Sequence, residues 1–421
     1  MNMMIAPLSR RRLACLLLVA VGLLASAHLA LGGAALAKPA KPAKGAKWNT
    51  LSGAQPLLVG HRGEKAFMPE HTLASYWQAA VENADYIEPD LTLTRDGHLV
   101  VTHNEWLGDT TDVASIGALA HLRTSKTWDS GLGTTTVRNE WFVGDMTLDQ
   151  IRLLRVHQDP RYPWRPQHFD GMFGLLTFAE YLQVVLNVTA ELGRPYGVIP
   201  ELKSPRLHNA GRPYARYFED RALLTMEHYG FARLTGPVNR TAHADLRLPA
   251  PVHANATRGP AAWQSFDLDA AEYLAGRSTA QVVALVETLP WVFTPRGLDR
   301  VSRFAAVLSP WKDFFAAGPE PVLRAANATW DPAEIARLGG FVAPDRLVAE
   351  AHRRGMAVSP YTFYDSHQDR AYLCPRGAFC PASREEELFR FFDLGADYLF
   401  VENIVEASLL RARYGDRLGR R

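Results

Sequence analysis

Three carboxylates in the first half of the chain have the types and spacing of a site for a divalent cation. Glu88 and Asp90 stand two residues apart in an apolar run, so on a β-strand both side chains would point to the same side. Glu201 lies in another apolar run and would complete the set from a second strand. Carboxylates without thiolates or a histidine triad favour Ca2+ or Mg2+ over Zn2+. The alternative for Glu88 and Asp90 is a solvated strand, but the apolar residues around them indicate burial, where an unpaired carboxylate is costly.

Two histidines and two cations accompany these carboxylates. His61 and His103 each come directly after a run of apolar β-forming residues. One histidine could take a proton from a nucleophile while the other gives a proton to a leaving group, and the sequence leaves open which does which. Arg62 and Lys203 would supply positive charge for an anionic substrate, or would pair with the neighbouring carboxylates.

The elements that must position these residues are short apolar runs that end in polar side chains. Eight runs have the character of strands: Leu57 to Gly60, Tyr86 to Thr92, Leu99 to His103, Gly197 to Leu202, Trp263 to Phe266, Val282 to Leu285, Met356 to Tyr361 and Tyr398 to Val401. Between several of them, apolar residues recur at intervals of three and four, which is typical of helices: Glu70 to Glu82, Tyr214 to Tyr229, Arg346 to Arg354 and Arg384 to Leu394.

Strands that alternate with helices predict an α/β fold with a parallel sheet, and eight such units predict a (β/α)8 TIM barrel. The ends of its strands would share one rim, where the polar residues described above would meet. The turn at Asp96 and Gly97 is too short for a crossover helix, so we expect a helix to be missing between Thr92 and His103. The segment from about 109 to 174 lacks the strand–helix rhythm and is predicted to be an insertion at the rim.

Length and composition limit the function classes. The chain has 421 residues, of which 47% are hydrophobic and 21% charged, as in an ordinary folded protein. Its 46 basic and 44 acidic residues nearly cancel, so no positive field argues for a nucleic-acid partner. Three cysteines exclude a disulfide-dense scaffold and leave no C-x-x-C pair for a zinc site.

The amino terminus has the pattern of an export signal. Arg10 to Arg12 precede an apolar run and then small residues, which predicts a signal peptide over 1–37, with an uncleaved membrane anchor as the alternative. Residues 38–50 are predicted to be a flexible linker, followed by a catalytic domain over 51–415. After cleavage we expect an exported protein, periplasmic or secreted, without stable membrane insertion. In that oxidising setting Cys374 and Cys380 are predicted to form a disulfide.

Six motifs, in order and at family spacing, together resemble the glycerophosphodiester phosphodiesterase family, and most of all its exported bacterial branch. They are His61-Arg62-Gly63, Pro69-Glu70-His71-Thr72, Ala84-Asp85-Tyr86-Ile87-Glu88-Pro89-Asp90, Thr94-Arg95-Asp96-Gly97, Val100-Val101-Thr102-His103 and Pro200-Glu201-Leu202-Lys203. Three places depart from the family pattern. Asn104 stands where an Asp is usual, Gly108-Asp109 precede Thr110-Thr111 where an Arg is usual, and Glu402-Asn403 occupy a place where an Asp is common.

The resemblance implies a role for each matching residue. Glu88, Asp90 and Glu201 would hold the cation, usually Ca2+ in exported members and Mg2+ in others. His61 and His103 would be the acid/base pair, and Arg62 would contact the phosphate with Lys203 beside it. Phe266 and Tyr361 match positions that wall the substrate pocket.

The activity implied by the resemblance is hydrolysis of small glycerophosphodiesters, such as glycerophosphocholine or glycerophosphoethanolamine, to sn-glycerol 3-phosphate and an alcohol. A lysophospholipid, a sphingolipid or glycerophosphoinositol is the alternative substrate, with the insertion at 109–174 as the segment that could set specificity. A barrel that binds such a ligand without turnover is a third possibility. Attack by water and attack through a cyclic phosphate both remain open, as does the oligomeric state.

Overall fold

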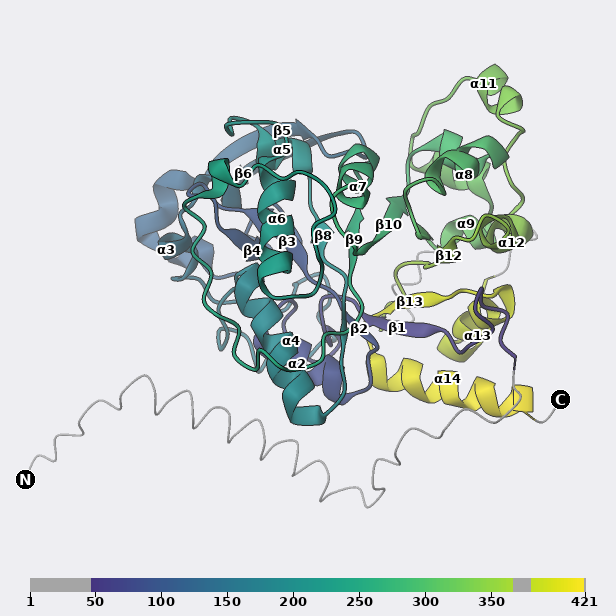
Figure 1. Cartoon of the computed structure of the whole chain (residues 1–421), viewed down its shortest axis with the longest axis horizontal. Coiled ribbons are helices and arrows are strands. Elements are labelled where there is room, and N and C mark those ends of the chain that lie inside the picture. The colour runs from purple at the N-terminus through teal and green to yellow at the C-terminus, as the bar shows by residue number, and fades with distance from the viewer. Residues whose placement is uncertain (1–46, 366–379, 420–421) are drawn as a thin grey trace, which may run out of the picture. The chain divides into compact units, whose positions relative to one another are not determined.

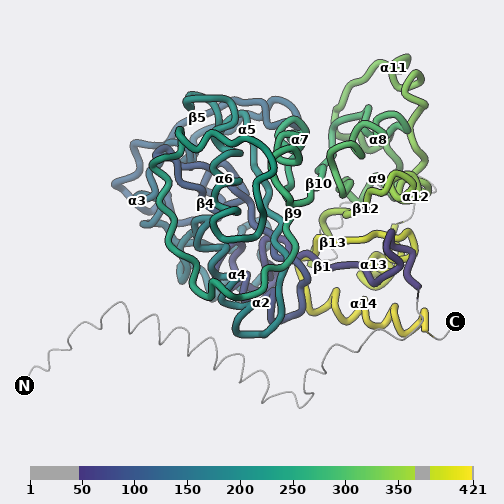
Figure 2. The backbone as a smooth tube through the Cα atoms, in the orientation of Figure 1, coloured from purple at the N-terminus to yellow at the C-terminus, as the bar shows by residue number. Residues whose placement is uncertain are grey.

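Eight parallel strands form the wall of a closed barrel in the computed structural model, which describes residues 47–365 and 380–419 (Figure 1). In chain order they are β1 (Leu57–Gly60), β2 with β3 (Tyr86–Ile87 and Asp90–Leu93), β7 with β8 (Gly197–Val198 and Glu201–Leu202), β9 (Ala262–Ser265), β10 (Gln281–Val286), β11 (Val307–Pro310), β12 (Ala357–Val358) and β13 (Tyr398–Val401). The first strand, β1, pairs with the last, β13, and the purple and yellow ends of the tube meet there in Figure 2. Between β12 and β13, Asp397 N–H donates to the Val358 carbonyl and Phe363 N–H donates to the Phe400 carbonyl, both at 2.8 Å. The predicted (β/α)8 barrel is confirmed.

Helices connect the strands and pack against the outside of the wall (Figure 1). The longer helices are α2 (Leu73–Val81), α4 (Phe178–Leu192), α6 (Tyr217–His228), α7 (Leu268–Ala275), α8 (Pro295–Val301), α10 (Pro319–Ala325), α13 (Arg384–Leu394) and α14 (Ile404–Gly419). The shorter ones are α3 (Leu148–Ile151), α5 (Pro205–Asn209), α9 (Asp313–Ala316), α11 (Pro332–Arg337) and α12 (Leu347–His352). Local sequence sets their bounds, as α4 illustrates: Thr177 and Glu180 form a capping box at its start, and Gly193 ends it with φ 69°. The four predicted helices correspond to α2, α6, α12 and α13.

Two apolar layers stabilise the barrel. The larger lies between the strands and the helices. The smaller fills the inside of the barrel with side chains that alternate along the strands, among them Val59, Tyr86, Ile199, Val283 and Phe400. A packed interior leaves the carboxyl-terminal rim as the place where a cavity can open.

The run Leu99 to His103 is not a strand of the parallel wall, which corrects one of the eight predicted barrel strands. It forms β4 (Leu99–Val101), which pairs antiparallel with β3, with Leu91 opposite Val101. The expected missing helix is confirmed, because the turn at Asp96 and Gly97 reverses the chain directly. The eighth parallel strand is β11, which the sequence reasoning missed because Ser309 and Pro310 interrupt its apolar run.

The insertion at 109–174 follows β4 and has a core of its own. It contains an antiparallel hairpin, β5 (Thr124–Asp129) and β6 (Thr134–Glu140). A separate cluster of buried apolar side chains, including Trp141, Met146 and Leu154, stabilises it. The Trp128 indole donates to Ser204 Oγ at 3.0 Å, which fixes the hairpin against the chain just after β8. The insertion therefore stands at the rim, as predicted.

The compact unit begins at Lys47, earlier than the predicted domain start at residue 51. Trp48 is 4% exposed and packs against Phe392 and Tyr414, with ring centroids 5.5 and 5.1 Å apart. Residues 47–50 thus belong to the fold rather than to the predicted linker. The reason is that burial of the Trp48 indole removes a large apolar surface from water, which favours an ordered chain at this position over a flexible linker.

Truncating this anchor is expected to destabilise the protein. Trp48→Ala should lower the free energy of unfolding by about 3–5 kcal/mol, because the other aromatic rings around it cannot close the space it leaves. Chemical denaturation with urea measures the change. Leu51→Ala, at a side chain that is 43% exposed, is the control and should change the midpoint little. Equal midpoints for Trp48→Ala and the wild type would contradict the assignment.

Some predictions fall on residues that the structure does not describe. The signal peptide over 1–37, most of the linker and Cys374 of the predicted disulfide lie outside the described residues. Within residues 47–365 and 380–419, no helix is long and apolar enough to cross a membrane.

Candidate active site

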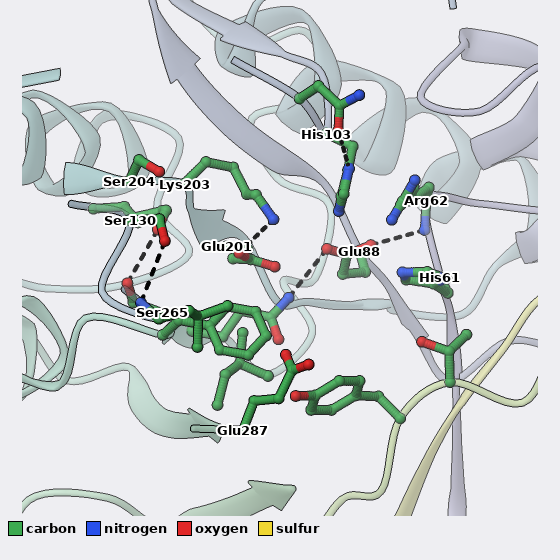
Figure 3. A pocket seen from close by; sticks show the side chains of 18 of the residues that line it. His61, Arg62, Glu88, His103, Ser130, Glu201, Lys203, Ser204, Ser265 and Glu287 are labelled. Atoms are coloured by element: carbon green, nitrogen blue, oxygen red, sulfur yellow. Dashed lines mark hydrogen bonds and ion pairs between the residues drawn. The ribbon is translucent and has the colours of Figure 1, made fainter. Parts of the chain in front are cut away.

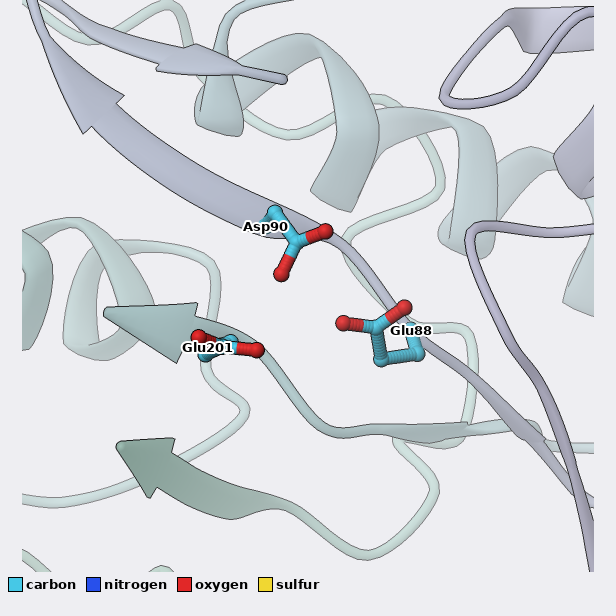
Figure 4. Close-up of side chains that lie close together, drawn as sticks. All are labelled: Glu88, Asp90 and Glu201. Atoms are coloured by element: carbon cyan, nitrogen blue, oxygen red, sulfur yellow. The ribbon is translucent and has the colours of Figure 1, made fainter. Parts of the chain in front are cut away.

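The three predicted carboxylates meet at the rim. Glu88 follows β2, Asp90 begins β3 and Glu201 begins β8, and each offers an oxygen within 4.8 Å of the others (Figure 4). Pro89 and Pro200 cause this placement, because neither has an N–H to donate and both strands break at the proline. The wall resumes as β3 and β8, where Asp90 pairs with Glu201 in parallel register.

The electrostatics of these carboxylates fit a cation. Burial and the charges of Asp90 and Glu201 raise the pKa of Glu88 well above its usual range. Burial, opposed by Lys203, raises the pKa of Glu201 to about 8. Oxygen Oδ1 of Asp90 is buried and accepts no hydrogen bond. Buried, mutually repelling carboxylates with an unpartnered oxygen are the donor set that Ca2+ or Mg2+ prefers.

His71, in the motif Pro69-Glu70-His71-Thr72, was not among the predicted site residues, and it fixes the orientation of Asp90. His71 Nε2 lies 2.9 Å from Asp90 Oδ2, and Nδ1 lies 2.7 Å from the hydroxyl of Tyr76. Burial opposes ionisation of Asp90, but Lys203, His103 and this hydrogen bond together hold the pKa of Asp90 well below its usual value. Asp90 is thus charged, with one oxygen held and the other free for a cation.

His61 and His103 both line the cavity above the carboxylates (Figure 3). Burial and the charge of Arg62 lower the pKa of His61 to about 4. Burial, Arg62 and Lys203 lower the pKa of His103 well below its ordinary value. Both imidazoles are therefore neutral at pH 7, a state in which either can accept a proton. His103 reaches the rim because antiparallel β4 returns beside Asp90, where Thr102 N–H donates to the Asp90 carbonyl at 3.1 Å.

Each histidine has a partner on its second nitrogen. Nδ1 of His61 lies 3.1 Å from Glu402 Oε1, and Nδ1 of His103 lies 2.7 Å from Asn104 Oδ1. Because Nδ1–H can donate to these oxygens, Nε2 of each ring is left to act toward a substrate. Asn104 is itself held by Asp109 Oδ2 at 2.9 Å. Asn104 and Glu402, which depart from the family pattern, thus supply the support that orients the histidines.

Glu402 was not among the predicted site residues, although it directly follows β13 as the other site residues follow their strands. Its side chain is fully buried and forms ion pairs with Lys65 Nζ, at 3.3 Å, and with Arg165. Burial opposes its ionisation, but Lys65, Arg165 and His61 hold the pKa of Glu402 well below its usual range. A charged carboxylate therefore faces the ring of His61.

The positively charged side chains of the site, Arg62 and Lys203, are also held in place. The Arg62 guanidinium pairs with Glu70 at 3.0 Å, and the Arg62 backbone N–H donates to Glu88 Oε2 at 2.7 Å. Arg62 has φ 60°, a strained conformation, and at the following Gly63 a Cβ would lie 2.3 Å from Ser75 Oγ. Lys203 pairs with Glu201 at 2.8 Å, so the pairing that the sequence left as an alternative is present.

Comparison with known proteins agrees with this geometry. The chain matches the Glycerophosphoryl diester phosphodiesterase family over residues 61–405. The chain belongs to this family. A glycerophosphodiester phosphodiesterase of Arabidopsis thaliana is 28% identical over 340 residues, which cover 77% of this chain and 79% of the relative. The enzyme of that name from Haemophilus influenzae is 28% identical over 199 residues, 45% of this chain and half of that protein.

Solved structures agree on the fold. A structure from Silicibacter pomeroyi assigned to the same family has a TM-score of 0.52 at 18% identity and covers 87% of this chain and 98% of its own. A structure from Agrobacterium tumefaciens has a TM-score of 0.50 at 15% identity and covers 86% of this chain and 98% of its own.

In this glycerophosphodiester phosphodiesterase family member, the site opens into a cavity of about 470 Å³. All the predicted site residues line it except Asp90. Phe266 and Tyr361 stand on one wall with ring centroids 5.8 Å apart and nearly perpendicular planes. The cavity is also lined by Trp106, together with Trp128 and Tyr162 of the insertion. The structure thus brings the predicted residues together, and their individual roles stay predictions.

Loss of the Glu402 charge should change the pH dependence of activity. Because Glu402 raises the pKa of His61 against burial, Glu402→Gln should lower that pKa further and move the acid limb of kcat/KM to lower pH. It should also lower kcat by about 10- to 100-fold, since the ring loses its orienting partner. A pH profile of kcat/KM measures both effects.

Glu402→Asp is the matched control because it keeps the charge, and its acid limb should stay closer to that of the wild type. Glu402→Gln also leaves Lys65 and Arg165 without their shared partner, so its melting temperature must be measured alongside. An unshifted acid limb in folded Glu402→Gln would show that Glu402 does not act on His61.

Proposed function

We propose that this protein hydrolyses small glycerophosphodiesters, such as glycerophosphocholine and glycerophosphoethanolamine, to sn-glycerol 3-phosphate and an alcohol. The observation that carries the proposal is the placement of two neutral histidines in one cavity with Glu88 and Glu201, which form a buried carboxylate cluster with Asp90. A phosphodiester is anionic and repels nucleophiles, so its hydrolysis needs positive charge and proton transfer at one place. Arg62 and Lys203 provide that charge.

Glu88, Asp90 and Glu201 would hold a divalent cation, with Ca2+ favoured and Mg2+ as the alternative. When bound, the cation would supply Lewis-acid stabilisation of the charge that develops on the phosphoryl oxygens. Nε2 of one histidine would accept the proton of the attacking oxygen, and Nε2 of the other, once protonated, would donate to the departing alkoxide. Glu402 would stabilise the positive charge on His61 when that ring carries the proton.

The decisive experiment measures release of sn-glycerol 3-phosphate from glycerophosphocholine by the purified protein with Ca2+, with Mg2+ and with a chelator. Release that requires a metal and disappears in His61→Ala is the expected result. His121→Ala, at an exposed histidine of the insertion, is the matched control and should retain activity. No release from a folded protein with either metal would overturn the simple substrate assignment and favour a lysophospholipid, a sphingolipid or glycerophosphoinositol.

We propose also that the reaction takes place outside the cytoplasm. The proposal rests on the sequence of residues 1–37, with its arginines, apolar run and small residues before the predicted cleavage site. Fractionation of cells that express the full chain tests it. A mature protein that starts near residue 38 in the periplasm or the medium would support export, and an intact chain in the cytoplasm would overturn it.

A further inference from the structure

The half of the rim that does not carry the cation site is lined by different kinds of side chain. Each of the four consecutive strands β9, β10, β11 and β12 leads to one partly buried side chain that lines the cavity. In chain order these are Phe266, Glu287, Trp311 and Tyr361. These four place three aromatic side chains and one carboxylate along the cavity, which Asp267 and Tyr364 also line.

Glu287 stands apart from the three carboxylates of the cation site. It follows β10, and Figure 3 shows its carboxylate directed into the cavity, with Glu88 and Glu201 farther along. Among the side chains of residues 47–365 and 380–419, no cation lies within ion-pair distance of Glu287. Lys203 is paired with Glu201 at 2.8 Å, and its Nζ lies over the Phe266 ring, 5.9 Å from the ring centroid. Burial raises the pKa of Glu287, while the charge of Lys203 and a hydrogen bond from Tyr361 oppose that rise.

The aromatic side chains suit a positively charged ligand. Phe266 and Tyr361 meet edge to face, with centroids 5.8 Å apart, so their ring faces point in different directions. A cation within about 6 Å of an aromatic ring face is attracted by the ring, and the attraction grows when water is excluded. The Tyr361 hydroxyl is already engaged, since its one proton has two acceptors, the Glu287 carboxylate and the Val286 carbonyl at 3.3 Å. These four side chains thus offer negative charge and aromatic surface but few free donors for the hydroxyls of a sugar or polyol.

We propose that Glu287, with Phe266, Trp311 and Tyr361, forms a subsite for the ammonium group of a cationic head group. The inference rests on the proposed function, because the phosphate of the same substrate would lie at Arg62 and the carboxylate cluster. The preferred substrates are then diesters of amino alcohols, with a quaternary or primary ammonium, rather than diesters whose second alcohol is uncharged.

The test compares two substrates that differ in head-group charge, glycerophosphocholine and bis(glycero)phosphate. Glu287→Gln keeps the size of the side chain and removes its charge. It should lower kcat/KM for glycerophosphocholine by about 10- to 100-fold, chiefly through KM, and change kcat/KM for bis(glycero)phosphate by less than about twofold. Glu334→Gln, at an exposed position of α11, is the control and should leave both values unchanged.

Equal losses on both substrates would overturn the proposal, because Glu287 would then serve the glycerol common to both or the fold itself. No loss on either substrate would overturn it as well. Thermal melting of Glu287→Gln separates a folding defect from a binding defect. If the variant does not fold, Trp311→Leu replaces it and should show the same selective loss.

A binding measurement separates this proposal from the proposed function. Tetramethylammonium is added to the wild type and to Glu287→Gln, and binding is followed by the change in tryptophan fluorescence or by calorimetry. If the wild type releases glycerol 3-phosphate from no diester, the proposed function fails, and binding that is lost in Glu287→Gln would still support the subsite. Equal binding to both proteins, or none to the wild type, would overturn the subsite.

Discussion

Replacing His103 with alanine should lower kcat for glycerophosphocholine hydrolysis by about 10²- to 10⁴-fold, and His61→Ala should have an effect of similar size. Both rings are neutral and face the same cavity, and no other described histidine lines it. If the two act in one proton-transfer sequence, as proposed, the double variant should lose little more than either single variant. Steady-state kinetics at saturating metal measures these losses.

The same variants can show which histidine is the acid. A glycerophosphodiester with p-nitrophenol as the leaving group needs no protonation of the departing oxygen. The variant that lacks the general acid should recover most of its activity on this substrate, and the variant that lacks the base should not. His121→Ala again controls for loss of an imidazole in general. Full activity of His61→Ala and His103→Ala on both substrates would exclude the acid/base pair.

Divalent cations should raise the melting temperature of the protein. Glu88→Gln should lose most of this stabilisation. Three carboxylates within 4.8 Å repel one another when charged, so bound Ca2+ or Mg2+ should raise the melting temperature relative to chelator. At a free metal concentration of about 100 times Kd the gain is about 2.7 kcal/mol. Glu88→Gln removes one ligand charge without changing side-chain size, so it should lose most of this gain and at least about 10²-fold in activity.

The stability of Glu88→Gln relative to the wild type in the presence of chelator distinguishes a cation site from an ordinary cluster of buried polar groups. Without metal, Glu88→Gln should be as stable as the wild type or more stable, because it removes a buried carboxyl group whose ionisation is opposed by burial and by Asp90 and Glu201. Glu334→Gln is the control for the substitution. A wild-type melting temperature that does not respond to either metal would contradict the site, whatever the activity of the variant.

The sequence predicted the barrel and the residues that meet at its rim. The number of strands was correct only because two errors in the strand prediction cancelled. The count of eight strands was right although Leu99 to Val101 belongs to a hairpin and Val307 to Pro310 was missed. A hydrophobic pattern does not distinguish a parallel strand from an antiparallel one of the same length, because pairing depends on residues far away in the chain. His103 lies at the site because the hairpin returns to it, and not because it ends a parallel strand.

The residues that the sequence reasoning missed show where a local pattern stops being informative. Glu287 and Glu402 follow β10 and β13 directly, so the reasoning that selected Glu201 could have selected both if it had been applied to every strand. His71 gave no such signal, since it precedes α2 and reaches Asp90 only through the folded loop after β1. Contacts of this kind depend on backbone geometry, such as the positive φ of His71, that a sequence pattern does not specify.

The separate core of the insertion has a consequence for hydrogen exchange and for protein engineering. Its buried apolar cluster is distinct from those of the barrel, so residues 109–174 can open and close as a cooperative unit while the strands stay intact. Amide hydrogens of residues in this cluster, such as Met146 and Leu154, should therefore exchange with solvent together, and sooner than those of β10. Because Trp128 and Tyr162 stand on this unit, one wall of the cavity can be exchanged between family members as a module, provided that Asp109 and Arg165, which hold Asn104 and Glu402, are kept.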